Sequence, residues 1–444
     1  MTPQHPSSRT TIFLDQPPSC LQFCPSSPNN FVIGTYLLSS ETKQRPETED
    51  NDASSDDEPS ETIHQTKTGS LQLWNLEPET DALTQLSRYA LPHAVFDLQF
   101  HPRIPDLLGI ATSAGTVSLF TVSARDEEAG FAHLATYRVH EDPSIPALFL
   151  AWLPEGWLPC SGRDGFAATF SDGRTGVFGV DSAAAVDHGP DSNAGKNDES
   201  HEVAELTSFN AKQPIEIWFA AAAVFPHNQG LDNPQKVAST PYLFTGDDFG
   251  ALQTISFPDI DPSPDTETDP DQDTIPAPLL KTTDKALHHT AGVTSILPLP
   301  IPLDHAVTSG SPLLLTGSYD ECLRVYHANG RGRVIAEEGL GGGVWRLQLL
   351  DTTTSASERD WIFLVLASCM HGGTRVVRVV ISAGEEVTAE IEVLAEFTEH
   401  ESMNYASGVW GLDTRVRGAE EGSELKVVSS SFYDKRVCVW TVKV

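Results

Sequence analysis

The chain has 444 residues, and hydrophobic residues make up 39% of them, which is enough for a substantial core. Its 62 acidic residues outnumber its 28 lysines and arginines, so the formal net charge is −34. Nucleic acids and anionic membranes bind basic surfaces, so we expect neither to be the main partner. The chain has no apolar run of about 18 residues and no apolar leader segment, so we expect a cytoplasmic protein.

Most of the chain reads as short strands, because β-branched and aromatic runs alternate with Gly, Asn, Asp and Pro. One unit recurs: an apolar strand that often ends in proline, a second strand that leads into a turn, and a third strand of alternating pattern. The first strands, in chain order, are CLQFCP (20–25), VFDLQFHP (95–102), ALFLAWLP (147–154), IEIWFAAAAVFP (215–226), GVTSILPLP (292–300), GVWRLQLL (343–350) and GVWGLD (408–413). Seven such units predict an all-β fold, the seven-bladed WD-repeat β-propeller.

The predicted domain is a single propeller over residues 9–444. An N-terminal strand at about 9–14 (RTTIFL) would complete the last blade and leave no free sheet edge. Segments that are poor in apolar residues interrupt the units and cannot bury enough surface to order themselves. We expect disordered or loop insertions, most of them acidic, at 41–67, 181–205, 228–236 and 259–284. A closed ring has no need of a second chain, so we expect a monomer.

The turns between second and third strands carry a recurrent aspartate. In WD repeats this aspartate lies six residues before a tryptophan, as Asp434 lies before Trp440. Weaker versions of the pair are Asp320 with Tyr326, Asp172 with Phe178, and Asp248 with Thr254. We interpret these aspartates as structural, because a turn carboxylate accepts backbone N–H groups and can anchor a histidine. The expected histidine partners are His400 for Asp434 and His289 for Asp320.

The sixth unit breaks this pattern, because His371 stands in the aspartate position and Val377 in the tryptophan position. A histidine in a surface turn is most often simply solvated. Here an apolar run leads into the turn and two glycines follow it, which leaves room for another chain to approach. His371 is therefore the best single candidate for a functional side chain.

The sequence carries no recognised catalytic motif. It has no G-x-S-x-G, Walker A or H-E-x-x-H sequence, and its cysteines form no metal-binding pattern, so we expect neither metal nor cofactor. Trp218, Trp345 and Trp410 stand at similar points of innermost strands, with Tyr405 just before the last of them. Aromatic side chains at a channel mouth can bind a quaternary ammonium group, although tryptophans in these places could equally pack between blades.

Four motifs occur in a fixed order along the second half of the chain. They are LLTGSYDECLRVY (314–326), GGGVWRLQ (341–348), ASCMHGG (367–373) and SSSFYDKRVCVW (429–440). Together they resemble the diphthine methyltransferase family of WD-repeat proteins, and the segments at 20–38, 215–226 and 244–252 are similar to the same family. The likeness departs at YASGVW (405–410), where Val409 stands in place of an acid, so we assign no catalytic role to that position.

The resemblance implies an activity. Family members hydrolyse the methyl ester of methylated diphthine on translation elongation factor 2, and release methanol and diphthine before the final amidation to diphthamide. The implied function is thus a carboxylic ester hydrolase without a cofactor, with elongation factor 2 as its protein substrate. Pattern alone would instead indicate a non-catalytic scaffold that docks elongation factor 2 or another protein, and this alternative stays open.

Ester hydrolysis needs a base for water and donors for the developing oxyanion. We predict His371 as the base, with Asp247 and Asp248 either orienting it or taking its place. The predicted oxyanion or substrate-binding groups are the N–H groups of Gly341, Gly342 and Gly343, with Arg346 as a charged alternative. The predicted ligands of the substrate's trimethylammonium group are Trp218, Trp345, Trp410 and Tyr405.

Overall fold

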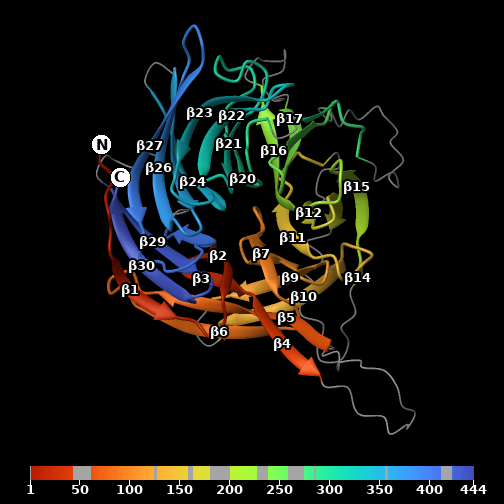
Figure 1. Ribbon diagram of the computed structural model, residues 1–444, viewed down its shortest axis with the longest axis vertical. Helices are drawn as coiled ribbons and strands as arrows, with labels where there is room; N and C mark the ends of the chain where they lie inside the picture. The colour runs from red at the N-terminus through yellow and green to blue at the C-terminus, as the bar shows by residue number, and fades with distance from the viewer. Residues whose placement is uncertain are drawn as a thin grey trace, which may run out of the picture.

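A computed structural model describes residues 2–43, 62–124, 128–158, 164–180, 201–227, 239–258, 275–284, 287–355, 359–411 and 423–444. In these ranges the chain forms strands arranged as a ring of seven sheets (Figure 1). The seven-bladed propeller predicted from the repeats is therefore confirmed. No helix in the described ranges is long and apolar enough to cross a membrane.

The first three blades take up the N-terminal part of the chain. Blade one contains β2 (Pro18–Cys24), β3 (Ser27–Thr35), β5 (Thr62–Leu76) and β6 (Leu83–Leu91), and β4 (Leu37–Lys43) pairs with the beginning of β5. Blade two contains β7 (Val95–Phe100), β8 (Leu107–Thr112), β9 (Thr116–Ser123) and β10 (Gly130–Arg138), extended by β14 (His201–Glu202). Blade three contains β11 (Ala147–Trp152), β12 (Asp164–Phe170), β13 (Arg174–Val180) and β15 (Ala204–Asn210).

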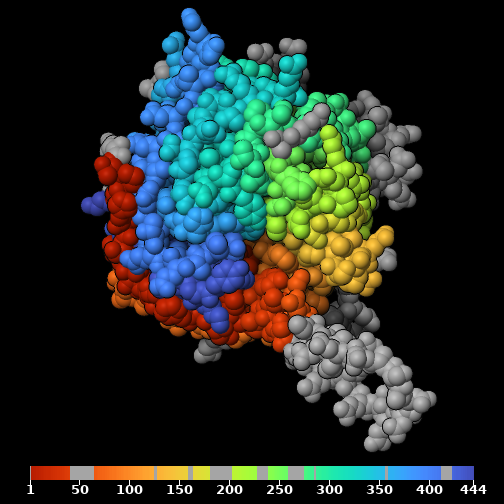
Figure 2. Space-filling model, viewed as in Figure 1, coloured from red at the N-terminus to blue at the C-terminus, as the bar shows by residue number. Residues whose placement is uncertain are grey.

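The remaining blades follow in chain order around the ring. Blade four contains β16 (Ile217–Pro226), β17 (Ser239–Asp247), β18 (Leu252–Ser256) and β19 (Leu280–Thr283). Blade five contains β20 (Val293–Pro298), β21 (Leu313–Ser318), β22 (Cys322–His327) and β23 (Arg333–Gly339). Blade six contains β24 (Arg346–Thr354), β25 (Asp360–Ser368), β26 (Thr374–Ser382) and β27 (Thr388–Phe397), and its β26–β27 hairpin stands out at the top of the view (Figure 2).

Blade seven joins the two ends of the described chain. It contains β28 (Ala406–Val409), β29 (Glu424–Ser431), β30 (Arg436–Lys443) and, as its outermost strand, β1 (Ser8–Phe13). β1 runs antiparallel to β30, with Thr11 opposite Cys438 and Phe13 opposite Arg436. The N-terminal strand thus covers what would otherwise be a free edge of β30.

The predicted insertions lie largely outside the described residues, at 44–61, 181–200, 228–236 and 259–274. Parts of the predicted insertions do lie within the described ranges. Several of these parts form strands, whereas the prediction gave loops or disordered segments. Lys43 pairs with Thr62 in a β4–β5 hairpin, and β19 is the outermost strand of blade four although it lies inside the predicted insertion at 259–284. Outer strands such as β19, with the sequence LKTT, are held by backbone hydrogen bonds and need no apolar alternation.

Second strands form the densest part of the core. All six residues of β8 and all six residues of β21 are buried. These strands have a sheet neighbour on each side and an adjacent blade over each face, so their sequences are almost continuously apolar. The ring is therefore held together by side chains packed between blades.

Two ends of the ring can be distinguished from strand register. The first residues of innermost strands pair with the last residues of second strands, as Arg346 pairs with Ser368 and Ala406 with Ser430. The turns between second and third strands follow directly, so these turns and the starts of innermost strands share one end. We call this end, marked by the pairs above, the turn rim, and the opposite end the far rim.

The structural interpretation of the turn aspartates needs a correction at two of them. Asp172 does lie against a histidine ring, with its Oδ2 atom 3.1 Å from Nε2 of His140. Asp434 instead accepts a hydrogen bond from the backbone N–H of Glu401, the residue after His400. The His400 ring turns inward, where its Nε2 atom lies 2.8 Å from Oγ of Ser429.

Asp320 follows the same rule in blade five. It accepts the backbone N–H of Thr290, the residue after His289. The His289 ring reaches inward to Oγ1 of Thr316 at 2.8 Å. The carboxylates therefore secure the loop that carries each histidine, and a buried hydroxyl binds the ring.

Candidate functional site

Four aromatic side chains from four successive blades meet at the turn rim. The ring centroid of Trp218 lies 5.6 Å from that of Trp345 and 6.1 Å from that of Tyr319. Trp345 in turn lies 5.9 Å from Tyr319 and 5.0 Å from Tyr405. We call Trp218, Tyr319, Trp345 and Tyr405 the aromatic cluster. Three of its members belong to the predicted ligands of the ammonium group, and the structure adds Tyr319.

The cluster is fixed by its own polar contacts. The indole Nε1 of Trp218 donates a 2.6 Å hydrogen bond to Oδ1 of Asp248, which anchors the ring and brings a carboxyl group beside the cluster. Burial raises the pKa of the Tyr319 phenol, and the nearby Asp248 raises it further. Burial also raises the pKa of Tyr405. Both phenols therefore stay uncharged at neutral pH, and their rings offer neutral faces to a cation.

Trp410 does not belong to this cluster, contrary to the prediction. It follows the last residue of β28, so it lies toward the far rim. Its indole donates a hydrogen bond to Oδ1 of Asn29 in blade one, and the Lys426 ammonium lies 5.9 Å from its ring. Tyr405, which immediately precedes β28, occupies the place that Trp345 occupies before β24.

His371 lies in the turn between β25 and β26, at the turn rim. Its side chain is 57% exposed, and its Nε2 atom lies 3.5 Å from Oε1 of Glu321 in the corresponding turn of blade five. Its Nδ1 atom has no hydrogen bond within the described part of the chain. The turn also bonds to the loop before β28, since the N–H of Met370 donates to the carbonyl of Asn404.

The glycine run before β24 packs backbone against backbone with the His371 turn. A Cβ atom at Gly342 would come within 2.2 Å of the Cys369 carbonyl oxygen, so no larger residue fits there. Gly341 has a φ of 75°, a conformation that favours glycine. Among the described residues, no acceptor binds the N–H groups of Gly341, Gly342 and Gly343. Of these three glycines, Gly341 is exposed, whereas Gly342 and Gly343 are buried.

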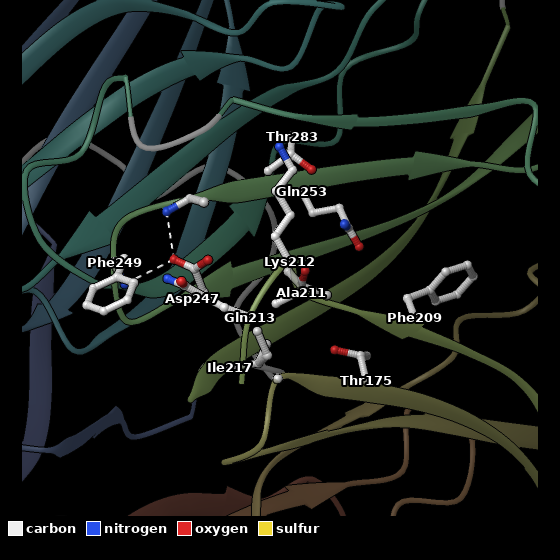
Figure 3. Close-up of a pocket in the computed structure, with 13 residues that line it drawn as sticks. Thr175, Phe209, Ala211, Lys212, Gln213, Ile217, Asp247, Phe249, Gln253 and Thr283 are labelled. Carbon is white, nitrogen blue, oxygen red and sulfur yellow. Dashed lines mark hydrogen bonds between the residues drawn. The ribbon is translucent and has the colours of Figure 1, made fainter. Parts of the chain in front are cut away.

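The structure does not bring Asp247 and Asp248 to His371. Oδ1 of Asp247 accepts the N–H groups of Phe249 and Ala251 at 3.0 and 2.8 Å, so this carboxylate stabilises its own turn (Figure 3). Burial raises its pKa, and it faces a groove of about 310 Å³ between blades three and four. Asp248 binds Trp218, and neither aspartate contacts His371 within the described chain.

Strand register shows that the turn position occupied by aspartate in other blades is not occupied by Asp248 in blade four. Gly246 pairs with Leu252, as Gly317 pairs with Leu323 in blade five. The third of the intervening residues is Asp320 in blade five and Phe249 in blade four. The sequence spacing from Asp248 to Thr254 therefore pointed to the wrong residue by one position, and Phe249 is 60% exposed on the rim.

Arg346 turns into the central channel rather than toward the rim. Its Nη1 atom donates to the carbonyl of Thr294, and its Nη2 atom lies 3.7 Å from Oδ1 of Asp97 in blade two. Its guanidinium lies 4.7 Å from the Trp345 ring centroid and 4.9 Å from that of Phe149 in blade three. Arg346 therefore reaches from blade six to the opposite side of the ring.

Asp97 is the channel residue that the sequence prediction missed. Its side chain is only 3% exposed, and burial raises its pKa to about 6, an effect that the nearby Arg346 partly offsets. Asp97 interrupts the apolar strand VFDLQF, and a charged residue in an innermost strand was the available signal. Among the described residues, no group of three or more His, Cys, Asp or Glu side chains is placed to hold a metal ion.

The chain is similar in sequence to a known protein. The chain is 31% identical over 157 residues to diphthine methyltransferase of Schizosaccharomyces pombe, a match that spans 35% of this chain and 39% of that protein. The chain thus matches well under half of that relative's length. No family model matches the chain. The resemblance to the diphthine methyltransferase family is confirmed over the matched residues.

Solved structures give the fold. Sqt1 of Saccharomyces cerevisiae superposes with a TM-score of 0.50 and 12% identity, covering 99% of this chain and all of that one. Sqt1 of Chaetomium thermophilum, bound to the N-terminus of ribosomal protein L10, gives 0.49 and 14%, covering 98% and 99%. At 12% identity the likeness to the Saccharomyces cerevisiae protein shows the propeller architecture alone.

Proposed function

We propose that this propeller hydrolyses the methyl ester of methylated diphthine on translation elongation factor 2, with release of methanol and diphthine before the final amidation to diphthamide. The relative named diphthine methyltransferase supports a role in this pathway. The reaction would take place in the cytoplasm and would use no cofactor. The partner would be a protein with a basic surface, because the net charge of −34 would attract it and speed encounter.

The aromatic cluster is the observation that carries this proposal. A quaternary ammonium cannot donate hydrogen bonds, so aromatic faces and a nearby carboxylate are the groups that recognise it. Trp218, Trp345 and two neutral phenols supply the faces, and Asp248 supplies the carboxyl group. Such contacts contribute about 2 kcal/mol or more to binding once water is removed.

His371 would act as the general base. Glu321 would hold one ring nitrogen and leave Nδ1 to take a proton from water as the water oxygen attacks the ester carbonyl carbon. Two sets of donors lie next to Trp345 to take the resulting negative charge: the glycine N–H groups at 341–343, and Arg346. Collapse of the intermediate breaks the bond to the methoxy group, which leaves as methanol with the proton returned by His371.

The test is release of methanol by purified His371→Ala protein and by a matched control, His227→Ala, whose ring contacts Thr240 in blade four instead. We expect His371→Ala to lower turnover by about 10²- to 10⁴-fold with folding intact, and the control to keep its rate. A folded His371→Ala protein with near-normal turnover would remove His371 from the mechanism. Absence of methanol with wild-type protein would instead leave a propeller that only docks its partner.

A further inference from the structure

The central channel holds a cavity directly beside the aromatic cluster. Its volume is about 150 Å³, and its walls come from β2, β7, β24, β25 and β28. Tyr405 belongs both to the cavity wall and to the aromatic cluster, so the two spaces adjoin. The volume equals that of about five water molecules, which is enough for a small polar group.

Arg346 lines this cavity with donors that the protein does not use. Both bonds of its Nη1 group go to backbone carbonyls, those of Thr294 and Trp345. The distance of 3.7 Å from Nη2 to Asp97 is an ion pair but too long for a hydrogen bond. Since an arginine carries five N–H donors, the Nε and Nη2 groups have no hydrogen-bond acceptor within the described chain. The side chain is only 20% exposed, so bulk water does not fully compensate.

Gln348 and Asp97 are two other polar residues that line this cavity. The Oε1 atom of Gln348, two residues along β24 from Arg346, is buried and has no partner among the described residues. Asp97 accepts hydrogen bonds through Oδ2 from Gln99 and Leu150, and its Oδ1 atom lies 3.7 Å from Nη2 of Arg346. Burial raises the pKa of Asp97 to about 6, and the nearby Arg346 partly offsets this rise. The 3.7 Å contact between Nη2 and Asp97 leaves the Nε and Nη2 donors of Arg346 unused within the described chain. An incoming acceptor can therefore take the free donors of Arg346.

Carboxylate and ester carbonyl oxygens are the acceptors that match a guanidinium fork. The neighbouring aromatic cluster offers neutral faces and no unpaired cation, which suits a quaternary ammonium. The Arg346 guanidinium lies over the Trp345 ring, so the ammonium would lie on the aromatic surface of the cluster that Arg346 does not cover. The two subsites therefore match the two ends of one small zwitterion or its ester.

We propose that the channel cavity binds the carboxyl end of a compound whose quaternary ammonium lies on the aromatic cluster, with Arg346 donating to the carbonyl oxygen. This assignment rests on the proposed function in taking the compound as the modified side chain of the partner. It selects Arg346, rather than the glycine N–H groups, as the donor to the developing oxyanion. Asp97 is then a positioning residue that keeps the guanidinium in the channel.

Two small probes separate the two ends of the ligand. Tetramethylammonium carries the cation alone, and glycine betaine carries a trimethylammonium and a carboxylate. We expect the full-length protein, titrated by NMR or calorimetry, to bind betaine about tenfold more tightly than tetramethylammonium, as one charge-assisted hydrogen-bonded contact would give. Equal binding of the two probes, or binding of neither, would overturn the proposal.

Variants of Arg346 test which residue gives the preference. In Arg346→Met we expect the preference for betaine to vanish while tetramethylammonium still binds, at least as tightly as before because a like charge over Trp345 is removed. Retained tetramethylammonium binding also shows that the cluster is folded. Arg378→Met, which removes a surface arginine paired with Glu392, is the matched control and should keep the preference. If the methionine variant does not fold, Arg346→Lys should show a reduced preference, because lysine keeps the charge and loses the fork. An undiminished preference in both folded variants would exclude Arg346.

Methanol release separates this inference from the proposed function. Methanol production without a betaine preference would leave the hydrolase and refute the carboxyl subsite. A betaine preference lost in Arg346→Met, without methanol production, would leave the subsite and refute the hydrolase.

Discussion

His400, which is buried behind the turn of blade seven, shows how the state of one side chain can affect the stability of the whole protein. The Trp440 indole donates to Ser429 at 3.0 Å, and Ser429 also contacts Nε2 of His400. His400 is 8% exposed, and its Nδ1 atom is buried without a partner among the described residues. Burial lowers the pKa of His400 to about 4, so the folded protein holds this ring neutral.

We predict that the protein loses stability as the pH falls from about 6.5 to about 4. In that window the unfolded chain takes up a proton at His400 and the folded chain does not, so protonation favours unfolding. His400→Gln should remove about 1.4 kcal/mol per pH unit from this dependence. Because the pKa of Asp97 is raised to about 6 in the folded protein, protonation of Asp97 below that pH stabilises the fold and opposes the effect of His400. The contribution of His400 is therefore the difference between the pH dependence of wild type and that of the variant. Chemical denaturation at several pH values measures it, and identical slopes would contradict the assignment.

The tryptophans show where residue patterns stop predicting a site. Trp345 and Trp410 both follow Gly-Val, yet they lie toward opposite rims. β24 begins just after Trp345, whereas β28 begins before Trp410 and ends at the residue that precedes it. The residue at which an innermost strand begins is set by its pairing with the second strand of the blade. The residue type of the cluster was predictable from sequence. Which residues make up the cluster depended on strand register, which could not be predicted and which adds Tyr319. Register also places Phe249, instead of Asp248, at the turn position that aspartate occupies in other blades.

At the scale of elements, closure of the ring depends on β1. β30 carries the buried residues Val437, Val439 and Trp440, and β1 supplies the backbone partner for its outer edge. Without that partner, an exposed and strongly apolar strand would offer its N–H and C=O groups to other chains. The association of the two ends of the chain is therefore expected to protect against aggregation as well as unfolding.

Deletion of residues 2–13 tests this role. We expect a lower thermal midpoint and concentration-dependent self-association, measured by calorimetry and light scattering. Thr10→Ala keeps the backbone ladder of β1 and should behave like wild type. A truncated protein that stays monomeric with an unchanged midpoint would show that β1 does not contribute to closure.

The blades were predictable in number and order because nearly continuous apolar second strands, such as the fully buried β8 and β21, recur before third strands of alternating pattern. Outer strands were less predictable. β19 and the β4–β5 hairpin are polar and pair through the backbone, so their sequences look like the loops around them. Channel-facing residues were the least predictable, because Asp97 and Arg346 meet only when blades two and six close the ring.

At the scale of the molecule, the aromatic cluster exists because four blades bring one ring each to the same rim. No single blade carries enough aromatic surface to hold a cation, and the channel cavity beside it likewise needs strands from several blades. The account therefore makes the intact ring the unit of function. A cation held on the cluster would place an attached ester at the mouth of the channel.

The measurement that tests this account most directly is the mass of elongation factor 2 carrying methylated diphthine, after incubation with this protein alone. We predict loss of one methyl ester together with release of methanol, retained in Trp410→Leu and strongly slowed in Trp345→Leu. An unchanged mass while the two proteins still co-elute would contradict the account, and the propeller would then be a docking protein without this activity.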